Sequence, residues 1–159
     1  MNKKEGVVLL AAAAMSVSLY AYGQSKENII LKNSELYKII RVVDGDTVEI
    51  SVPYLPEPFK KTLKLRIDGV DTPEKSYLAK CAKERKLALV AKQFTEDSIK
   101  KAKVATVILK GWGKYGGRVI GDIVLDGEKL SKKLVDNGLA KVYIGGKGPK
   151  FKWCSKVKI

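Results

Sequence analysis

The feature that most constrains the fold is a series of short β-type segments separated by turn residues. Residues 37–43 are rich in β-branched side chains, and residues 47–52 and 62–67 alternate between apolar and polar positions. Asp44-Gly45 is a turn dipeptide between the first two segments, and a proline-bearing loop at 53–60 separates the second from the third. The pattern predicts an antiparallel meander of three strands.

A long helical segment follows this meander, at about 78–102. Two further β-type segments, at 104–109 and 119–125, and a short amphipathic helix near 130–135 complete the pattern. Five strands, with the long helix between the third and the fourth, predict an α+β fold of the OB type, a small five-stranded β-barrel with helices packed outside. We expect the long helix to bury one face, formed by Leu87, Val90, Ala91, Phe94 and Ser98.

The first residues have the three-part plan of a secretory signal peptide. Lys3 and Lys4 give a positive start, an apolar run interrupted only by serines spans 7–22, and small residues end the run at Gly23. The run is shorter than the roughly 20 residues of a membrane-spanning helix, although an uncleaved N-terminal anchor is the alternative. We therefore expect a secreted or periplasmic protein. The predicted divisions are a signal peptide or anchor at 1–23, a leader at 24–35, the folded domain at 36–145 and a basic tail at 146–159.

Export would place the two cysteines, Cys81 and Cys154, in an oxidising compartment. One disulfide and two unpaired thiols are both compatible with the sequence, because spacing along the chain does not set the distance between two sulfur atoms. Two cysteines are too few for a four-cysteine zinc site.

The composition narrows the chemistry that the domain can perform. The 159 residues include 31 Lys and Arg against 17 Asp and Glu, which gives a net charge of +14, and they include no histidine. Ser-His-Asp triads, histidine zinc sites and histidine-based nucleases are therefore excluded. The positive charge favours polyanionic partners, and any catalysis must come from carboxylates, Arg, Lys, Tyr or a hard metal ion.

The few carboxylates gather in two turns at the ends of predicted strands. Each turn alone is a common structural pattern, either a hairpin turn or a helix N-cap. Antiparallel neighbours can bring such turns together, and clustered carboxylates repel one another unless a cation lies among them. Oxygen ligands without His or Cys select Ca²⁺ or Mg²⁺, and a flexible site built from two turns favours Ca²⁺. The two turns are Asp44-Gly45-Asp46-Thr47 and Asp71-Thr72-Pro73-Glu74.

Arginine is rare in this lysine-rich chain, so its positions are informative. A guanidinium group can bind phosphate oxygens with two parallel hydrogen bonds, although a surface ion pair is the simpler explanation for any single arginine. Arg66 precedes the second acidic turn, and Arg118 follows a glycine-rich loop at 111–117. That loop spells the dinucleotide motif G-x-G-x-x-G, but a β segment follows where the motif requires a helix. We expect the loop to present Lys114, Tyr115 and Arg118 instead.

Four separated strings of residues together resemble the thermonuclease, or staphylococcal nuclease-like, family. They occur in the family's order and cover roughly residues 37–143. The resemblance implies an OB-fold β-barrel with about three helices and a secreted, Ca²⁺-dependent, sugar-nonspecific endonuclease that hydrolyses phosphodiester bonds in DNA and RNA. We expect a monomer without a stable protein partner. The strings are Val43–Val48, Leu65–Glu74, Lys114–Arg118 and Asn137–Val142.

Matched motif by motif, the resemblance implies a role for each candidate residue. Asp46 and Asp71 would be carboxylate ligands of Ca²⁺, and Thr72 would offer its backbone carbonyl. Glu74 resembles the family's general base, which holds the attacking water. The other implied roles are a grip on the scissile phosphate by Arg66 and Arg118, contacts to a neighbouring phosphate by Lys114 and Tyr115, and stacking of a base on Tyr143.

The sequence departs from the family in two places, and two other functions stay open. Gly117 is an extra residue where the family commonly has K-Y-G-R, and it displaces Arg118 unless a bulge or a wider loop absorbs it. The proline-bearing loop at 53–60 has no clear family counterpart. The alternatives are a catalytically weak OB-fold module that binds nucleic acid and an anchored basic protein that binds acidic polymers.

Overall fold

The computed structural model describes residues 36–143 together with Trp153 and Cys154. The predicted signal peptide at 1–23, the leader at 24–35 and most of the basic tail at 146–159 lie outside the described residues. Within the part of the chain that the structure describes, no helix has the length and apolar character needed to cross a membrane.

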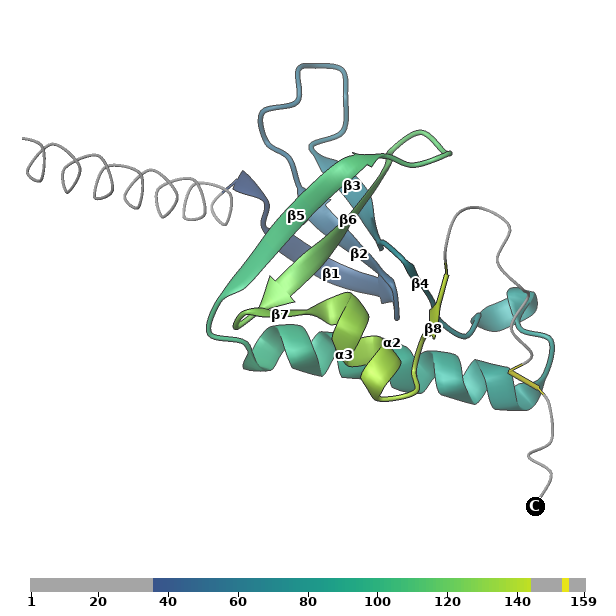
Figure 1. The fold of residues 1–159 in the computed structure, drawn as a ribbon. Coiled ribbons are helices and arrows are strands. Elements are labelled where there is room, and N and C mark those ends of the chain that lie inside the picture. The colour runs from purple at the N-terminus through teal and green to yellow at the C-terminus, as the bar shows by residue number, and fades with distance from the viewer. Residues whose placement is uncertain (1–35, 144–152, 155–159) are drawn as a thin grey trace, which may run out of the picture.

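Three antiparallel strands form the first half of the sheet, as the alternation predicts (Figure 1). They are β1 (Ile39–Asp44), β2 (Thr47–Ser51) and β3 (Thr62–Ile67). Alternate side chains of a strand point to the same face, so one face of β2 and β3 is buried and the other carries the polar residues. The buried positions of these two strands include Val48, Ile50, Leu65 and Ile67.

A hairpin of two longer strands, β5 (Ala105–Trp112) and β6 (Arg118–Leu125), completes the sheet. Strand β6 lies parallel to β3, which gives the strand order β1-β2-β3-β6-β5. In this register Lys64 lies opposite Arg118, and Arg66 lies opposite Ile120. The predicted α+β OB-fold is confirmed, and the parallel pair places two arginines on adjacent strands.

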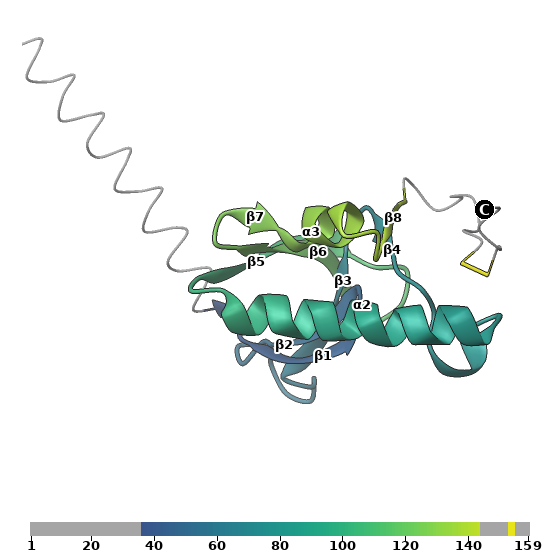
Figure 2. The same cartoon turned by 90° about the horizontal axis from the view of Figure 1, so that it is seen from below.

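The long helix, α2 (Ala82–Lys101), begins at Ala82 rather than at Leu78. The preceding residues, Ser76–Leu78, form a 3-10 turn, η1, and Cys81 caps the helix by accepting a hydrogen bond from the Glu84 N–H at 3.4 Å. Seen from below in Figure 2, α2 crosses one end of the sheet, with β1 and β2 on one side of it and β5 and β6 on the other. The helix therefore covers this end of the barrel.

The buried face of α2 differs from the predicted one. Val90, which we expected to be buried, is 52% exposed. The helix lies so close to the β1–β2 turn that small side chains occupy the contact positions, of which the prediction included Ala91 but not Thr95. The buried positions of the helix are Glu84, Ala88, Ala91 and Thr95.

The second α-helix, α3 (Leu130–Asp136), is the short amphipathic helix that the sequence predicts. The buried carboxylate of Asp122 fixes its first turn by accepting hydrogen bonds from the Ser131 N–H at 3.2 Å and from the Ser131 hydroxyl at 2.5 Å. The described residues thus contain two α-helices and one 3-10 turn, against the prediction of about three helices for the whole chain. The short strands are β4 (Val70–Asp71), β7 (Glu128–Lys129) and β8 (Lys141–Val142).

The apolar core lies between the sheet and the two α-helices, where full burial of each large aliphatic side chain contributes about 1.5–3 kcal/mol. Strand β4 pairs with β8, which draws the end of the domain against the segment that carries Asp71. The fully buried core residues include Ile50, Leu65, Ile67, Val107, Ile123, Leu130 and Leu134.

Position 45 requires glycine because the β1–β2 turn touches α2. A Cβ atom at Gly45 would lie 2.8 Å from the Ala91 Cβ and 3.1 Å from the Thr72 Cγ2. The same turn is bonded to the helix by Thr95, whose hydroxyl donates to the Gly45 carbonyl at 2.7 Å. Helix α2 therefore sets the position of Asp46, the next residue in the turn.

We predict that Gly45→Ala lowers the free energy of unfolding by about 1–3 kcal/mol, because the added methyl group overpacks this contact. Urea unfolding followed by circular dichroism measures the change. Gly116→Ala is the matched control, because a Cβ at Gly116 meets no atom within 4 Å, and it should be near neutral. Equal stability of Gly45→Ala and the parent protein would contradict the prediction.

Candidate active site

The two acidic turns meet around the buried carboxylate of Asp46, as their positions at strand ends predict. Asp46 Oδ2 accepts hydrogen bonds from the Thr72 N–H at 3.0 Å and from the Thr72 hydroxyl at 2.8 Å, and Oδ1 accepts one from the Thr47 hydroxyl at 3.1 Å. Burial raises the pKa of Asp46 above its usual 3.8, while the charge of Arg66 and the bonds from Thr72 oppose the shift. Asp46 therefore joins the first turn to the second.

Arg66 holds the two turns together with one guanidinium group. Its Nη1 donates to Asp46 Oδ1 at 2.5 Å, and its Nη2 donates to Asp71 Oδ1 at 2.9 Å and to the Val70 carbonyl at 3.4 Å. The side chain is 28% exposed, so one edge of the group is open to solvent. The planar fork of arginine makes this bridge, and the single ammonium group of a lysine could not reproduce it. Arg66 is thus a structural bridge between the two acidic turns and not a member of a simple surface ion pair.

Glu74 lies exposed beside this bridge. The protein around Glu74 removes part of the water that would stabilise its charge, and this desolvation is the largest cause that raises the pKa of Glu74 above its usual 4.5. The negative charges of Asp46 and Asp71 raise the pKa further, and the positive charge of Arg66 opposes the shift. The third neighbouring acid, Asp44, pairs with Lys75 at 2.9 Å, and Lys75 also donates to the Val43 carbonyl.

Negative charge exceeds positive charge in this cluster, although the chain as a whole is strongly basic. Carboxylates that gather in this way favour a bound cation, and an all-oxygen donor set suits a hard divalent ion. The side chain of Asp71 is 33% exposed, so a free oxygen is accessible from solvent. The donor chemistry of these residues therefore suits such an ion, with Arg66, Thr47 and Thr72 bonded to both Asp46 oxygens in this structure. The charged members are the acids Asp44, Asp46, Asp71 and Glu74 and the bases Arg66 and Lys75.

The structure adds Glu84, a residue that the sequence analysis missed. The buried Glu84 carboxylate accepts hydrogen bonds from the backbone N–H of Glu74 at 3.4 Å and of Lys80 at 2.7 Å, so it fixes both ends of the segment before α2. A signal was present, because Cys81-x-x-Glu84 has the spacing of a helix capping box. Glu84 therefore positions the backbone of Glu74.

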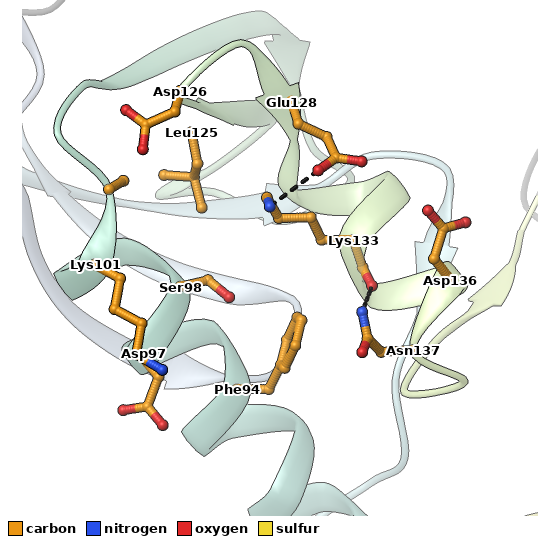
Figure 3. A pocket seen from close by; sticks show the side chains of 11 residues that line it. Phe94, Asp97, Ser98, Lys101, Leu125, Asp126, Glu128, Lys133, Asp136 and Asn137 are labelled. Atoms are coloured by element: carbon orange, nitrogen blue, oxygen red, sulfur yellow. Dashed lines mark hydrogen bonds and ion pairs between the residues drawn. The ribbon is translucent and has the colours of Figure 1, made fainter.

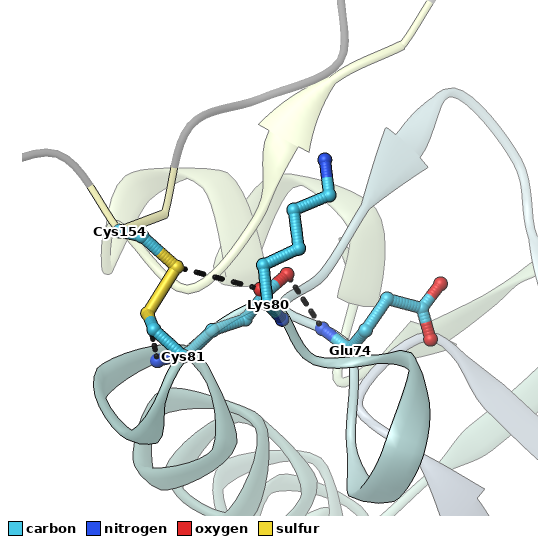
Figure 4. Close-up of a disulfide and its surroundings, with 5 residues drawn as sticks. Glu74, Lys80, Cys81 and Cys154 are labelled. Atoms are coloured by element: carbon cyan, nitrogen blue, oxygen red, sulfur yellow. Dashed lines mark hydrogen bonds between the residues drawn. A yellow bond between two sulfur atoms is a disulfide. The ribbon is translucent and has the colours of Figure 1, made fainter.

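The cysteines form a disulfide beside this segment, which resolves the choice that the sequence left open (Figure 4). The Cys81 and Cys154 sulfurs are 2.12 Å apart, and the bridge ties the chain after β8 to the start of α2. Both sulfurs also lie close to the carboxylate of Glu84. The bonded sulfurs carry no thiolate, so this trio offers no thiolate metal site.

Arg118 lies on the same face of the sheet as Arg66. Leu65 and Val119 point into the core, so their neighbours in the strands face outward. Lys64 pairs with Arg118 and Arg66 pairs with Ile120, which sets the two arginines diagonally on adjacent strands. Adjacent strands of a sheet lie about 4.8 Å apart, so two long side chains on one face of neighbouring strands can reach a common ligand. The structure thus brings together both arginines that the sequence singled out.

Gly117 lies in the turn before β6, and Arg118 is the first residue of that strand. The Arg118 N–H donates to the Tyr115 carbonyl at 3.3 Å, and Gly117 has a φ of +74°, which a non-glycine residue adopts at a cost of about 1–2 kcal/mol. The Gly117 carbonyl in turn accepts a hydrogen bond from the Lys64 N–H at 3.0 Å. The turn that contains Gly117 therefore leads directly into the parallel pairing of β3 with β6.

The other predicted contacts lie at two separate places. The Tyr115 ring packs against Arg118, with 5.5 Å between Cζ and the ring centroid, and Lys114 Nζ lies 5.8 Å from the same centroid. Tyr143 follows β8, and its N–H donates to the Gly69 carbonyl at 2.8 Å, which holds it beside β4. Lys114 and Tyr115 thus accompany Arg118, whereas Tyr143 lies on the side of Asp71.

A separate cavity of about 560 Å³ lies between the end of α2 and α3, away from the acidic cluster (Figure 3). Acidic side chains outnumber basic ones on its walls, and Glu128 pairs with Lys133 at 2.9 Å. This lining has the wrong charge for a polyanion. The charged lining residues are Asp97, Asp126, Glu128, Asp136, Lys101 and Lys133.

We predict that Glu74→Gln stabilises the folded protein at neutral pH when divalent ions are removed by a chelator. Folding raises the pKa of Glu74, so ionising this group costs the folded state free energy. The cost is absent below the usual pKa of 4.5 and complete above the raised one. The gain in the urea midpoint should therefore appear at neutral pH and vanish in acid.

Glu57→Gln is the control for this measurement, because Glu57 is 81% exposed and only pairs with Lys61 on the surface. Losing such a pair costs about 0–1 kcal/mol, so the control should be neutral or slightly destabilised. A Glu74→Gln protein that is no more stable than its parent at neutral pH would contradict the charge argument.

Comparison with known proteins agrees with this geometry. A family model described as "Staphylococcal nuclease homologue" matches residues 64–153, a stretch that includes Arg66, Asp71, Glu74 and Arg118. A thermonuclease from Staphylococcus hyicus is 28% identical over 144 residues, which cover 86% of this chain and 78% of that protein. Because the family model matches more than half of the chain, the protein belongs to the staphylococcal nuclease homologue family.

Proposed function

We propose that the protein is a secreted nuclease that uses Ca²⁺ to hydrolyse phosphodiester bonds of DNA and RNA. The observation that carries the proposal is the position of Arg66 between Asp46 and Asp71, with Glu74 beside them and Arg118 on the neighbouring strand. Family membership and the name of the Staphylococcus hyicus relative support the same activity. The net charge of +14 supports a polyanionic substrate with weak sequence preference.

The metal would be held by the carboxylates of Asp46 and Asp71 and by the backbone carbonyl of Thr72. The clustered acids and the all-oxygen donors support this assignment, and flexible coordination favours Ca²⁺ over Mg²⁺. When bound, the ion would supply the positive charge that Asp46 and Asp71 take from Arg66 in this structure, and it would polarise the phosphate.

Arg66 and Arg118 would hold the scissile phosphate. Both lie on one face of adjacent strands, and guanidinium groups bind phosphate oxygens through two parallel hydrogen bonds. Hydrolysis concentrates negative charge on the phosphoryl oxygens, so fixed positive groups stabilise the transition state more than the ground state. The neighbouring Lys114 and Tyr115 would contact the next phosphate of the strand, and Tyr143 would stack on a base.

Glu74 would act as the general base. Its raised pKa brings the carboxylate closer to the range in which a base accepts protons efficiently near neutral pH. Glu74 would take one proton from the attacking water as the water oxygen bonds to phosphorus. The bond from phosphorus to the leaving oxygen would break, and that oxygen would take a proton from solvent.

Two features support a nuclease that works outside the cytoplasm. The proposed signal peptide at 1–23 has the three-part plan described above, and the Cys81–Cys154 disulfide suits an oxidising compartment. A secreted or periplasmic location is therefore part of the proposal. The proposal includes a monomeric nuclease, since one chain carries all the residues of the proposed site.

The test is nicking of supercoiled plasmid and cleavage of RNA by the purified protein with Ca²⁺, with Mg²⁺ and with a chelator. We expect cleavage with Ca²⁺ and none with chelator. Glu74→Gln should abolish turnover while DNA binding stays near that of the parent. DNA binding without cleavage under any metal would overturn the proposal and favour the binding module.

We predict that Arg66→Lys lowers the cleavage rate about a hundredfold or more, because lysine cannot reproduce the two-pronged contact. Arg85→Lys, an exposed change on α2, is the matched control and should cleave at the parental rate. Initial rates of plasmid nicking at saturating Ca²⁺ measure both. Near-normal cleavage by Arg66→Lys would remove Arg66 from the proposed phosphate contact.

A further inference from the structure

A groove of about 750 Å³ lies between the β2–β3 loop and the β5–β6 loop. Figure 1 shows both loops at the end of the sheet opposite α2. The β2–β3 loop is the proline-bearing segment that has no clear counterpart in the family pattern, and the β5–β6 loop carries Lys114 and Tyr115. The groove-lining residues used below are Phe59, Trp112, Tyr115, Lys60, Lys64 and Arg118.

Aromatic side chains in the groove are unusually exposed. Phe59 is 61% exposed, Trp112 is 69% exposed and Tyr115 is 60% exposed. Rings that stay in water do not contribute the stabilisation that their burial would give. A contiguous exposed apolar patch commonly marks a binding surface. Phe59 comes from the β2–β3 loop, Tyr115 from the β5–β6 loop and Trp112 from the end of β5, so both connections contribute to the surface.

The β2–β3 loop is preformed rather than loose. The Leu55 N–H donates to the Val52 carbonyl at 3.2 Å, and the Phe59 N–H donates to the Pro56 carbonyl at 3.0 Å. Lys61 crosses the loop to the Leu55 carbonyl and pairs with Glu57 at 3.2 Å. Phe59 is therefore presented from a loop that is already ordered, which lowers the entropic cost of binding.

The charges of the groove match a polyanion. Lys60, Lys64 and Arg118 line it together with the rings. The acid among the described lining residues, Glu49, is bonded to Arg41 at 2.6 Å and to the Thr62 hydroxyl at 3.1 Å, so its charge is already compensated. Rings interleaved with cations are typical of surfaces that stack the bases of single strands, whereas a purely apolar partner would leave these cations unpaired.

The groove is continuous with the candidate active site through Arg118. This residue lines the groove, and it also lies diagonal to Arg66 on the outer face of β3 and β6. A strand whose phosphate rests on the two arginines would therefore extend along Tyr115 toward Trp112 and Phe59.

We propose that this groove binds unpaired nucleotides of a single-stranded DNA or RNA segment next to the scissile phosphate, by stacking bases on Trp112 and Phe59. The inference rests on the proposed nuclease function for its location, and it adds a stacking surface formed by residues of this chain's own β2–β3 loop and β5. Duplex DNA keeps its bases stacked on one another, so it cannot use the rings without local opening.

The test measures equilibrium binding of a fluorescent oligothymidylate of about 12 nucleotides, a length suited to one small barrel. A chelator in the buffer prevents cleavage during the measurement. An abasic oligonucleotide of equal length is the second probe, because it carries the phosphates without the bases. Trp112→Ala and Phe59→Ala should each weaken binding of oligothymidylate about tenfold and leave binding of the abasic strand unchanged. Trp112→Phe should restore most of the loss.

Leu89→Ala, which removes a 65% exposed apolar side chain from α2, is the matched control and should bind both probes like the parent. Unchanged oligothymidylate binding by both Trp112→Ala and Phe59→Ala would overturn the proposal. Binding of anionic vesicles or of a second copy of the chain in the groove would then be the alternative to test. Equal loss for both probes would also overturn it, because stacking would not be involved. Plasmid cleavage by the parent distinguishes failure of the groove from failure of the nuclease function.

Discussion

The described structure depends on one buried negative charge, the carboxylate of Asp46. An ionised carboxylate in a protein interior is unstable unless donors surround it. Its donors come from Thr47, from Thr72 and from Arg66, which lie on β2, on the segment after β4 and on β3. The requirement to satisfy Asp46 therefore gathers the elements that form the site, and fold and site share a single set of hydrogen bonds.

This arrangement concentrates the repulsion between carboxylates at the candidate active site. A chain with a net charge of +14 could disperse its acids among lysines, yet Asp44, Asp71 and Glu74 surround Asp46. Such clusters lower the stability of the isolated protein, and proteins tolerate them at functional sites because the same field shifts the pKa of catalytic groups. Helix α2 supports both acidic turns, because its Thr95 donates to the Gly45 carbonyl in the first turn and its Glu84 accepts from the Glu74 N–H in the second.

Local patterns predicted the elements well, and tertiary contacts explain the errors. Strand β3 has the predicted bounds, Thr62–Ile67, because alternation is a property of the segment itself. The predicted buried face of α2 was correct at Ala91 and wrong at Val90, because the β1–β2 turn also selects the polar Thr95, which hydrophobicity alone does not single out. The Cys81-x-x-Glu84 spacing indicates a residue at a helix start, but the bond from the Glu74 N–H to Glu84 and the Cys81–Cys154 pairing depend on distances in space.

The parallel pairing of β3 with β6 has a consequence for the order in which the molecule is built. These strands are separated along the chain by α2 and β5, so their contact closes a long loop and belongs to the slow, non-local part of folding. The lysine-rich helix and the first acidic turn arise from local sequence and can form early. Arg66 and Arg118 share a face only when the last half of the sheet has docked. A partly folded chain can therefore attract nucleic acid by charge before it holds the pair of arginines that would grip a phosphate.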